Sequence, residues 1–299
     1  MKDSLAKKEE RMAYIILVAP ALFLYLFVMA FPAVSSIMLS LSTYRGGKIF
    51  GSGNLGFGGL RAYTNIFKDQ YFFMALKNNI YIVLISVFGQ IPLGFFLAYI
   101  LYRGHIKGVG FFQAMIYLPN VIAAVIIGIL FYRFLLSSNS VLLEIQRRFN
   151  PAVEFMPGKN SMLMILVVIL WMYTGIYMLI FLANLQKIDN AVIEAAMIDG
   201  ASEMQTLRHI IFPALSGVIV TCAILAISGS LKSFDLIFVM TGGGPAYRTS
   251  VLSIYMYDKA FRGAPNYPVA NAISTIMVIV CFILIGLTRL AEKRFSSGE

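Results

Sequence analysis

Long apolar runs separated by short polar segments dominate the pattern along this chain. A helix that crosses the hydrocarbon core of a bilayer needs about 20 predominantly apolar residues. Six runs qualify, and they predict membrane helices at residues 13–41, 79–102, 110–136, 161–185, 214–239 and 268–290. The pattern therefore predicts an all-α membrane protein, with six transmembrane helices in a single transmembrane domain over residues 1–299.

The first apolar run follows the basic residues Lys7, Lys8 and Arg11, as the core of a signal peptide would. The run is much longer than a signal core of about 7–15 residues, and no small-residue cleavage site closes it. We therefore expect a retained helix. Six spans place both termini on one side of the membrane, and the basic N-terminal cluster favours the cytoplasmic side.

The composition excludes an ordinary soluble protein. The chain is 59% hydrophobic and 13% charged, against about 45–50% and about 25% in soluble domains. The net charge of +10 comes from basic residues grouped at the ends of apolar runs, such as Lys7-Lys8 and Lys293-Arg294. That distribution is typical of anchors for anionic lipid, so we expect contact with membrane lipid and no nucleic-acid partner.

The sequence contains no nucleotide-binding, catalytic or metal-ligating pattern. The stretch Gly46-Gly47-Lys48 lacks the Ser or Thr that follows Lys in a P-loop. His105 and His209 have no ligand partner at a useful spacing, while Cys222 and Cys281 lie inside apolar runs. We expect no enzyme activity, no metal and no cofactor on this chain, so energy for any active process must come from a partner.

Two prolines interrupt the predicted spans. Pro119 with Asn120 interrupts the third span, and Pro92 interrupts the second. A proline inside the membrane frees backbone groups that lipid cannot satisfy, so such breaks face protein or water. Pro92 alone predicts a simple kink, whereas Asn120 adds a side-chain amide and becomes a candidate for a polar pathway.

Polar residues also gather toward the end of the fifth span, at Ser230, Lys232, Ser233 and Asp235. Charged residues within spans are costly and usually face an interior cavity. Lys232 and Asp235 are three positions apart and are able to pair on one helix face. Structural pairing and pathway lining both remain open at this point.

The polar segment at residues 186–213, between the fourth and fifth spans, predicts two short helices joined by a turn. Residues 193–199 are rich in helix formers, and Gly200 follows where a left-handed residue is needed. Ser202 and Gln205 have the spacing of a capping box, and Pro213 marks the end of the second helix or a bend into the fifth span. Helices this short are unstable alone, so they must dock on a partner.

The charges of this segment indicate what kind of partner it has. Glu194, Asp199 and Glu203 outnumber Arg208. A helix that lies on lipid favours Lys and Arg on its polar face, so lipid is the weaker of the two alternatives. A protein partner with a basic socket fits the acidic pattern better.

The same segment resembles the EAA loop of binding-protein-dependent ABC importer permeases, through Glu194-Ala195-Ala196, Asp199-Gly200-Ala201 and Pro213. The stretch TGGGPAYRTSVLSIYMYDKAF at residues 241–261 resembles an outer-loop signature of the carbohydrate-uptake permeases. Gly59-Leu60-Arg61-Ala62-Tyr63 is similar to another of their motifs, with Ala62 where Asn is common. The resemblance covers essentially the whole chain and is closest to the maltose-type first permease subunit.

This resemblance implies a heterodimeric pore, made with a second permease subunit in a bacterial or archaeal cell membrane. Two cytoplasmic ABC ATPase subunits would bind ATP and Mg, and an extracellular or periplasmic solute-binding protein would deliver a carbohydrate. In such permeases the EAA loop is the cytoplasmic coupling helix, where Glu194 would pair with a basic residue of the ATPase. The implied coupling residues are Glu194, Ala195, Ala196, Asp199, Gly200, Ala201 and Pro213.

The resemblance also implies a sugar pathway. Aligned positions fall on Asn120, Ala124, Met172, Tyr173, Ser230 and Ser233. Tyr173 is expected either to stack on a pyranose face or simply to pack in the protein, and the polar residues to bind sugar hydroxyls, although Ala124 offers no polar group. With the charged residues of the fifth span, the expected pathway consists of Asn120, Tyr173, Ser230, Lys232, Ser233 and Asp235.

Two alternatives remain at this stage. The EAA loop is shared by importers of other solutes, such as glycerol phosphate. An ion-driven transporter would need paired acids deep in the spans and an inverted repeat, but Asp235 is the only acidic residue inside the predicted spans.

Overall fold

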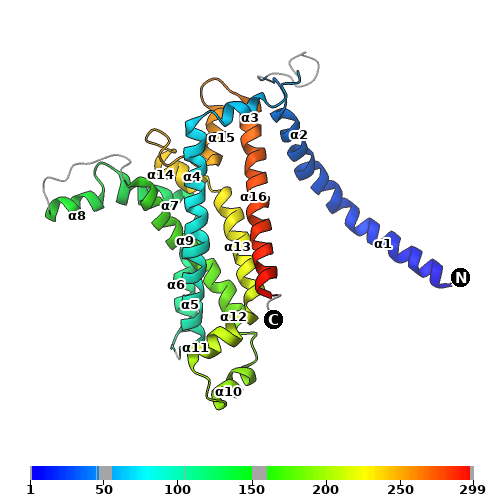
Figure 1. Cartoon of the computed structure of the whole chain (residues 1–299), viewed down its shortest axis with the longest axis vertical. Coiled ribbons are helices and arrows are strands. Elements are labelled where there is room, and N and C mark those ends of the chain that lie inside the picture. Colours follow the sequence, from blue (N-terminus) through cyan, green and yellow to red (C-terminus); the bar gives the residue numbers. More distant parts are fainter. Residues whose placement is uncertain (1, 45, 47–55, 105, 150–159, 297–299) are drawn as a thin grey trace. The chain divides into compact units, whose positions relative to one another are not determined.

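The structure is a computed structural model that describes residues 2–44, 46, 56–104, 106–149 and 160–296 (Figure 1). His105 and the Gly47-Lys48 pair lie outside these residues. The chain divides into two compact units. Unit 1 comprises Met1–Lys68 and Met256–Ile276, and unit 2 comprises Asp69–Tyr255 and Met277–Glu299.

Unit 1 contains the first apolar helix and a short connecting helix. α1 (Lys2–Tyr25), the π-helical turn η1 (Leu26–Ala30) and α2 (Phe31–Ser40) form one continuous rod, and α3 (Arg61–Ile66) follows. Ser36 of α2 donates a hydrogen bond of 2.7 Å to the side chain of Asn271 in the same unit. Within the described residues the only strand-like pairing is a single antiparallel bridge between Ser42 and Phe57.

Unit 2 contains most of the helices, and its elements run in chain order. They are α4 (Gln70–Ile85), η2 (Ser86–Gln90), α5 (Ile91–Arg103), α6 (Val109–Val121), α7 (Ala124–Phe131), η3 (Tyr132–Leu136), α8 (Val141–Phe149), α9 (Ser161–Leu185), α10 (Asn190–Ile198), α11 (Glu203–Thr206), η4 (Leu207–Ile211), α12 (Phe212–Ala214), α13 (Ser216–Leu231) and α14 (Asp235–Thr241). Two last helices, α15 (Leu252–Phe261) and α16 (Tyr267–Ser296), contribute residues to both units.

The prediction of an all-α protein with several membrane spans is confirmed. Among the described residues, five helices are long and apolar enough to cross a membrane, and a sixth candidate is a helix pair bent by 65°. The five are Met12–Ser40, Gln70–Arg103, Ala124–Phe149, Ser161–Leu185 and Tyr267–Leu290, and the bent pair is Glu203–Ala214 with Ser216–Leu231.

Proline explains three irregular turns in these helices. Proline has no N–H to donate, and its ring clashes with the carbonyl four residues earlier. In membrane helices a local π-helical turn is one way to satisfy the freed backbone groups. In the described part of the chain, three π-helical turns end two residues before a proline: η1 before Pro32, η2 before Pro92 and η4 before Pro213.

Two predicted spans are divided. The run at 110–136 forms α6 and α7, which are separated by extended backbone at Ile122 and Ala123. The expected break at Pro119 is therefore misplaced, because Pro119 lies inside α6. The run at 214–239 likewise forms α13 and α14, with residues 232–234 non-helical between them.

The division between α13 and α14 overturns one sequence-based alternative. The possible pairing of Lys232 with Asp235 requires both residues on one helix face. In the structure, Lys232 ends α13 and Asp235 begins α14. No ion pair joins these two described residues. Of the two alternatives that the sequence left open, the pairing is therefore not formed, and pathway lining stays a prediction.

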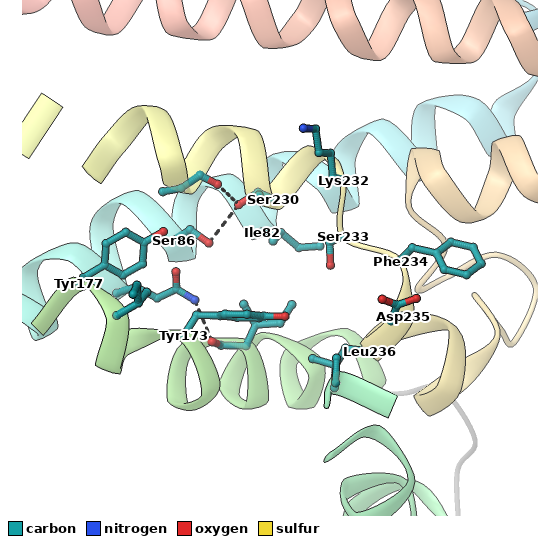
Figure 2. Close-up of a pocket in the computed structure, with 16 residues that line it drawn as sticks. Ile82, Ser86, Tyr173, Tyr177, Ser230, Lys232, Ser233, Phe234, Asp235 and Leu236 are labelled. Atoms are coloured by element: carbon teal, nitrogen blue, oxygen red, sulfur yellow. Dashed lines mark hydrogen bonds between the residues drawn. The ribbon is translucent and has the colours of Figure 1, made fainter. Parts of the chain in front are cut away.

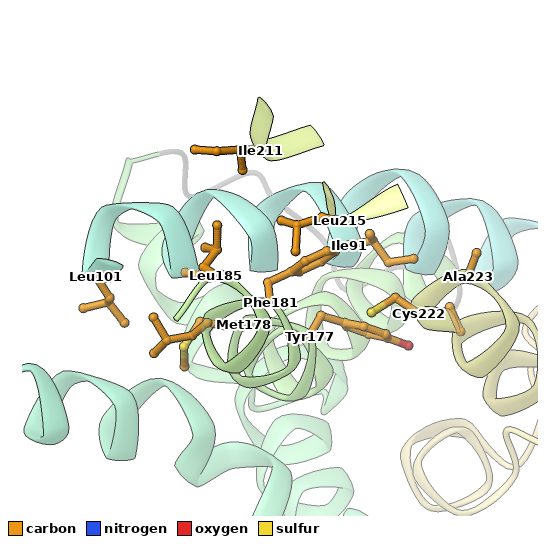
Figure 3. Close-up of a cluster of buried hydrophobic side chains, with 13 residues drawn as sticks. Ile91, Leu101, Tyr177, Met178, Phe181, Leu185, Ile211, Leu215, Cys222 and Ala223 are labelled. Atoms are coloured by element: carbon orange, nitrogen blue, oxygen red, sulfur yellow. The ribbon is translucent and has the colours of Figure 1, made fainter. Parts of the chain in front are cut away.

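α9 lies at the centre of unit 2 and packs in two hydrophobic clusters. One cluster joins α9 to α5, η4 and α13, and Figure 3 shows Phe181 of α9 beside Leu215, which directly precedes α13. The other joins α9 to α4, α7 and α14. α9 also approaches α6 closely, because a Cβ added at Gly175 of α9 would lie 2.5 Å from the Ile116 carbonyl oxygen of α6. α9 is thus fixed on several sides.

Candidate functional site

Unit 2 contains a partly open cavity of about 210 Å³ between α4, η2, α9 and the α13–α14 break (Figure 2). Its lining combines two tyrosines, several small polar side chains and two charged residues. The lining residues used below are Ser86, Gln90, Ala124, Tyr173, Tyr177, Ser230, Lys232, Ser233 and Asp235.

The structure brings together five of the six expected pathway residues. Tyr173, Ser230, Lys232, Ser233 and Asp235 all line the cavity. The sixth, Asn120, is half-buried on α6 and does not line the cavity. Of the other aligned positions, Ala124 lines the cavity, whereas Met172 is buried in the hydrophobic cluster.

Three polar lining residues were missed from the sequence: Ser86, Gln90 and Tyr177. The buried Gln90 amide donates a hydrogen bond of 2.8 Å to the Ile169 carbonyl, which ties η2 to α9. Ser86 accepts a hydrogen bond of 3.1 Å from the Ser230 hydroxyl across the cavity wall. The available signal was Pro92, because a proline two residues after Gln90 predicts irregular backbone where polar groups are freed.

The two charges of the cavity lie apart. Figure 2 shows Tyr173 and Asp235 facing the same hollow, whereas the Lys232 side chain extends on the other side of the α13–α14 break. Both charged side chains are largely exposed. A carboxylate beside a tyrosine ring is able to accept hydrogen bonds from hydroxyl groups while the ring covers an apolar face.

Two neighbouring asparagines of α4 hold the α13–α14 break in place. The fully buried Asn79 donates to the Ser230 carbonyl at 3.0 Å and accepts from the Leu252 N–H at 2.7 Å. Asn78 donates to the carbonyls of Arg248 and Ser250, at 3.0 and 2.8 Å. The loop between α14 and α15 is thereby fixed to α4 beside the cavity.

We expect Asn79→Leu to lower the thermal unfolding midpoint of the purified protein in detergent. The change removes one hydrogen bond of the Ser230 carbonyl and leaves the buried Leu252 N–H without its partner, at about 1–3 kcal/mol for the unpaired group. Asn120→Leu is the matched control, because no hydrogen bond is formed by that side chain within the described structure. Equal midpoints for the two variants would contradict this account of Asn79.

The loop between α14 and α15 has an unusual backbone. Gly242 and Gly243 have φ of 59° and 83°, and Ala246 and Tyr247 have φ of 49° and 60°. Non-glycine residues adopt such values at a cost of order 1–3 kcal/mol, so surrounding contacts must hold them. One such contact is a ring pair between Tyr247 and Tyr71, whose centroids are 4.6 Å apart.

Tyr255 and Asp69 join the start of α15 to the start of α4. The Tyr255 hydroxyl donates to the Asp69 carboxylate at 2.5 Å. Burial, and then this hydrogen bond, raise the pKa of Tyr255 above its ordinary value. Tyr255 therefore keeps its proton and remains a donor at neutral pH.

The EAA segment (residues 186–213) forms the predicted pair of helices. Asp189 caps α10 by accepting from the Ala191 N–H at 2.9 Å. At the other end of α10, Gly200 has φ of +82°. The N–H of Gly200 bonds to the Met197 carbonyl at 3.1 Å and that of Ala201 to the Ala196 carbonyl at 2.9 Å. These two bonds form the Schellman motif that ends a helix.

The second helix of the segment begins with the predicted capping box. The Ser202 N–H donates to the Gln205 side chain at 2.7 Å, and the Gln205 N–H donates to the Ser202 hydroxyl at 3.4 Å. Both predicted helices and the turn between them are therefore confirmed. Pro213, expected at the end of the segment, lies in α12 just before α13.

The EAA segment presents acidic and apolar side chains to its surroundings. Glu194, Ala195, Asp199, Gly200 and Pro213 are exposed, and Ala196 and Ala201 are half-buried. The Glu194 and Asp199 carboxylates have no ion-pair or hydrogen-bond partner in the described part of this chain. Ile198 is 86% exposed and Met204 is 70% exposed. An acidic surface with large bare apolar side chains is suited to docking on another protein.

Comparison with known proteins places this arrangement in a family. Residues 90–297 match the binding-protein-dependent transport system inner membrane component. The lactose transport system permease protein LacF of Rhizobium radiobacter is 33% identical over 274 residues, which cover 89% of each chain. The trehalose transport system permease protein SugA of Mycobacterium tuberculosis is 29% identical over 284 residues, which cover 93% of this chain and 89% of that protein.

A solved structure has the same fold. The crystal structure of a bacterial ABC transporter involved in the import of the acidic polysaccharide alginate includes a chain that superposes with a TM-score of 0.80 at 20% identity. The superposition covers 98% of this chain and 99% of that chain. Because the family match runs from Gln90 through the EAA segment and along α16, this multi-pass membrane protein belongs to the family of binding-protein-dependent transport system inner membrane components.

Proposed function

We propose that this chain is the permease subunit of an ATP-driven importer of a sugar or oligosaccharide, and that it forms half of the translocation pathway. The observation that carries the proposal is that unit 2 contains both a polar, aromatic cavity and an exposed acidic helix pair. The names of the lactose and trehalose permeases support a carbohydrate substrate.

The cavity has the chemistry that a sugar requires. A pyranose ring has apolar C–H faces that pack on an aromatic ring, and hydroxyl groups around its edge that donate and accept hydrogen bonds. Tyr173 and Tyr177 supply the rings, and Ser233 and Asp235 supply polar atoms. Ligand sites of this type are mostly apolar, with a few placed polar groups that fix orientation.

The EAA segment supplies the contact with the ATPase. Glu194 and Asp199 would pair with basic residues in a cleft of the ATPase, while Ile198 and Met204 would be covered by it. ATP and Mg would bind to two such ATPase subunits in the cytoplasm, and both termini of this chain would lie on that side. A second permease subunit would complete the pore, a solute-binding protein would deliver the sugar at the opposite side, and membrane lipid would surround the spans.

Transport would follow alternating access. Closure of the ATPase subunits on ATP would move the EAA segment, and the spans would rearrange so that the cavity changes the side to which it opens. This chain would perform no covalent chemistry and bind no cofactor, because hydrolysis occurs on the partner.

Reconstitution of the full complex in proteoliposomes tests the proposal. We expect uptake of radiolabelled lactose, trehalose or a longer oligosaccharide that requires ATP inside the compartment where the ATPase lies. A complex whose ATPase cannot hydrolyse ATP is the control. Uptake driven by a proton or sodium gradient without the ATPase, or uptake of glycerol phosphate but of no sugar, would contradict the proposal.

Removing the ring of Tyr173 should weaken transport more than removing its hydroxyl. An aromatic contact contributes about 0.5–1.5 kcal/mol beyond the burial of its area, so we expect Tyr173→Ala to lower uptake about 2–12-fold at saturating solute-binding protein. Tyr173→Phe should retain most of the rate. Trp171→Ala is the control outside the cavity lining. If it lowered uptake as much as Tyr173→Ala does, a general loss of packing, and not a lost contact with the sugar, would explain the effect.

A further inference from the structure

One end of α5 holds the start of α11. The Tyr99 hydroxyl donates to a carboxylate oxygen of Glu203 at 2.9 Å, and Arg103 Nε lies 3.4 Å from the same oxygen. These two contacts lower the pKa of Glu203, and the Tyr99 hydrogen bond is the largest single cause. Glu203 therefore remains a carboxylate at neutral pH and keeps both partners.

The same helix also holds the other two helices of this region. The Tyr102 hydroxyl lies 3.2 Å from the side-chain oxygen of Asn190, at the start of α10. The Phe95 ring stacks on the Phe212 ring of α12, with centroids 5.0 Å apart. α10, α11 and α12 are thus each held by α5.

These four residues form a single stripe. Positions 95, 99, 102 and 103 have the spacing of neighbours on one helix face, so one side of α5 faces the EAA segment. Apolar packing lies beside the stripe, where Leu101 of α5, Ile211 of η4 and Leu215 share a cluster in which Ile211 is fully buried. The polar contacts thereby fix the register of a segment that is already packed against the helix.

The opposite end of the same span reaches the cavity. α5 continues without a break into η2, and Ser86 and Gln90 of η2 line the cavity. From Ser86 to Arg103 the helix is about 26 Å long, at 1.5 Å per residue. Figure 1 shows α10 and α11 at the end of α5 that is remote from α4.

We propose that Tyr99, Tyr102 and Arg103 are positioning residues that join the EAA segment to α5, so that the two move as one body and displace Ser86 and Gln90 at the cavity. The proposal rests on the proposed function, because it assumes that an ATPase moves the EAA segment. It adds the route by which that movement reaches the substrate.

A triple variant tests the route while keeping all the rings. We expect Y99F/Y102F/R103Q to assemble with its partners and to hydrolyse ATP, but to transport less sugar for each ATP. Exposed polar pairs each contribute modestly, so a rise of about fivefold in ATP hydrolysed per sugar is expected when all are lost. The control is Y132F/R133Q, which changes a Tyr-Arg pair in η3 that makes no contact with the EAA segment.

Exchanging the charges of Arg103 and Glu203 tests whether their ion pair couples ATP hydrolysis to uptake. Arg103→Glu alone places two carboxylates together and should uncouple hydrolysis from uptake, whereas Arg103→Glu combined with Glu203→Arg should restore the ratio. A purely structural role would lower assembly and hydrolysis together, without changing the ratio. If the triple variant hydrolysed as much ATP per sugar as the wild type, while the wild type transported sugar, this inference would be overturned and the proposed function would stand. If the wild type itself showed no ATP-driven uptake, the proposed function would be overturned.

A cleavable crosslink tests whether the two parts move together. Cysteines at positions 102 and 190, in a protein whose Cys222 and Cys281 are replaced by Ala, would be bridged by a short disulfide-containing linker. Because the bridged groups belong to one moving body, we expect uptake to continue at the rate of the unbridged variant. Uptake that stops on bridging and returns on reduction would show that the segment slides along α5, and would overturn the proposal.

Discussion

Gly200→Val is expected to lower ATP-driven uptake about tenfold, because a left-handed backbone costs an L-residue roughly 1–2 kcal/mol and a β-branched residue more. Gly200 has φ of +82°, and a Cβ added there would meet no atom within 4 Å. The effect would therefore come from the backbone of the turn and not from a clash. Without the turn, α10 and α11 lose the relative orientation in which α5 holds them and which the proposed contact with the ATPase would require.

Gly200→Asn is the matched control, since Asn adopts the left-handed conformation more readily than Val. We expect Asn to retain most of the uptake. The measurements are uptake in proteoliposomes and the amount of ATPase that co-purifies with each variant. If Val and Asn reduced uptake equally, the left-handed turn would not be the cause.

Gly175→Ala is expected to destabilise the protein by about 1–3 kcal/mol, the usual cost of adding a carbon to a well-packed interior. The added Cβ would lie 2.5 Å from the Ile116 carbonyl oxygen and 2.8 Å from Tyr117 Cα. Both neighbours are backbone atoms of α6, so they cannot move aside without shifting the helix. Thermal unfolding in detergent, followed by the loss of monodisperse protein, measures the change.

Gly286→Ala serves as the control for helix propensity. Gly286 lies within α16, and an added Cβ there would meet nothing within 4 Å. Ala is favoured over Gly in a helix by about 0.8–1.0 kcal/mol, so this variant should be as stable as the wild type or more so. A lower midpoint for Gly286→Ala than for Gly175→Ala would refute the assignment of close α6–α9 packing.

The EAA segment could be predicted from its sequence because local rules determine it. A left-handed glycine, a Ser-Gln capping box and a proline each act within a few residues, and they specified the turn and both helices. The apolar runs likewise predicted the membrane spans, because a bilayer demands a minimum length of apolar helix whatever its neighbours are.

The breaks and the cavity depend on residues that are distant in the sequence. The helix end at Lys232 is stabilised by Asn79, which bonds to the Ser230 carbonyl from 151 positions away. No local pattern reveals such a partner, so the run at 214–239 resembled one helix. For the same reason Tyr177 and Ser86 were missed: they line the cavity only because α9 and η2 meet there.

Gly94 limits how the cavity can change its shape. A Cβ at this position of α5 would lie 2.8 Å from Tyr177 Cβ and 2.9 Å from the Met178 backbone nitrogen, so α5 and α9 touch almost backbone to backbone. Two helices in such contact cannot rotate or slip past each other, and the walls that they supply must stay at a constant separation throughout the transport cycle. The walls supplied by α5 and α9 therefore move as one body, and the width of the passage changes on the opposite side, where the backbone between Leu231 and Asp235 leaves the regular helix.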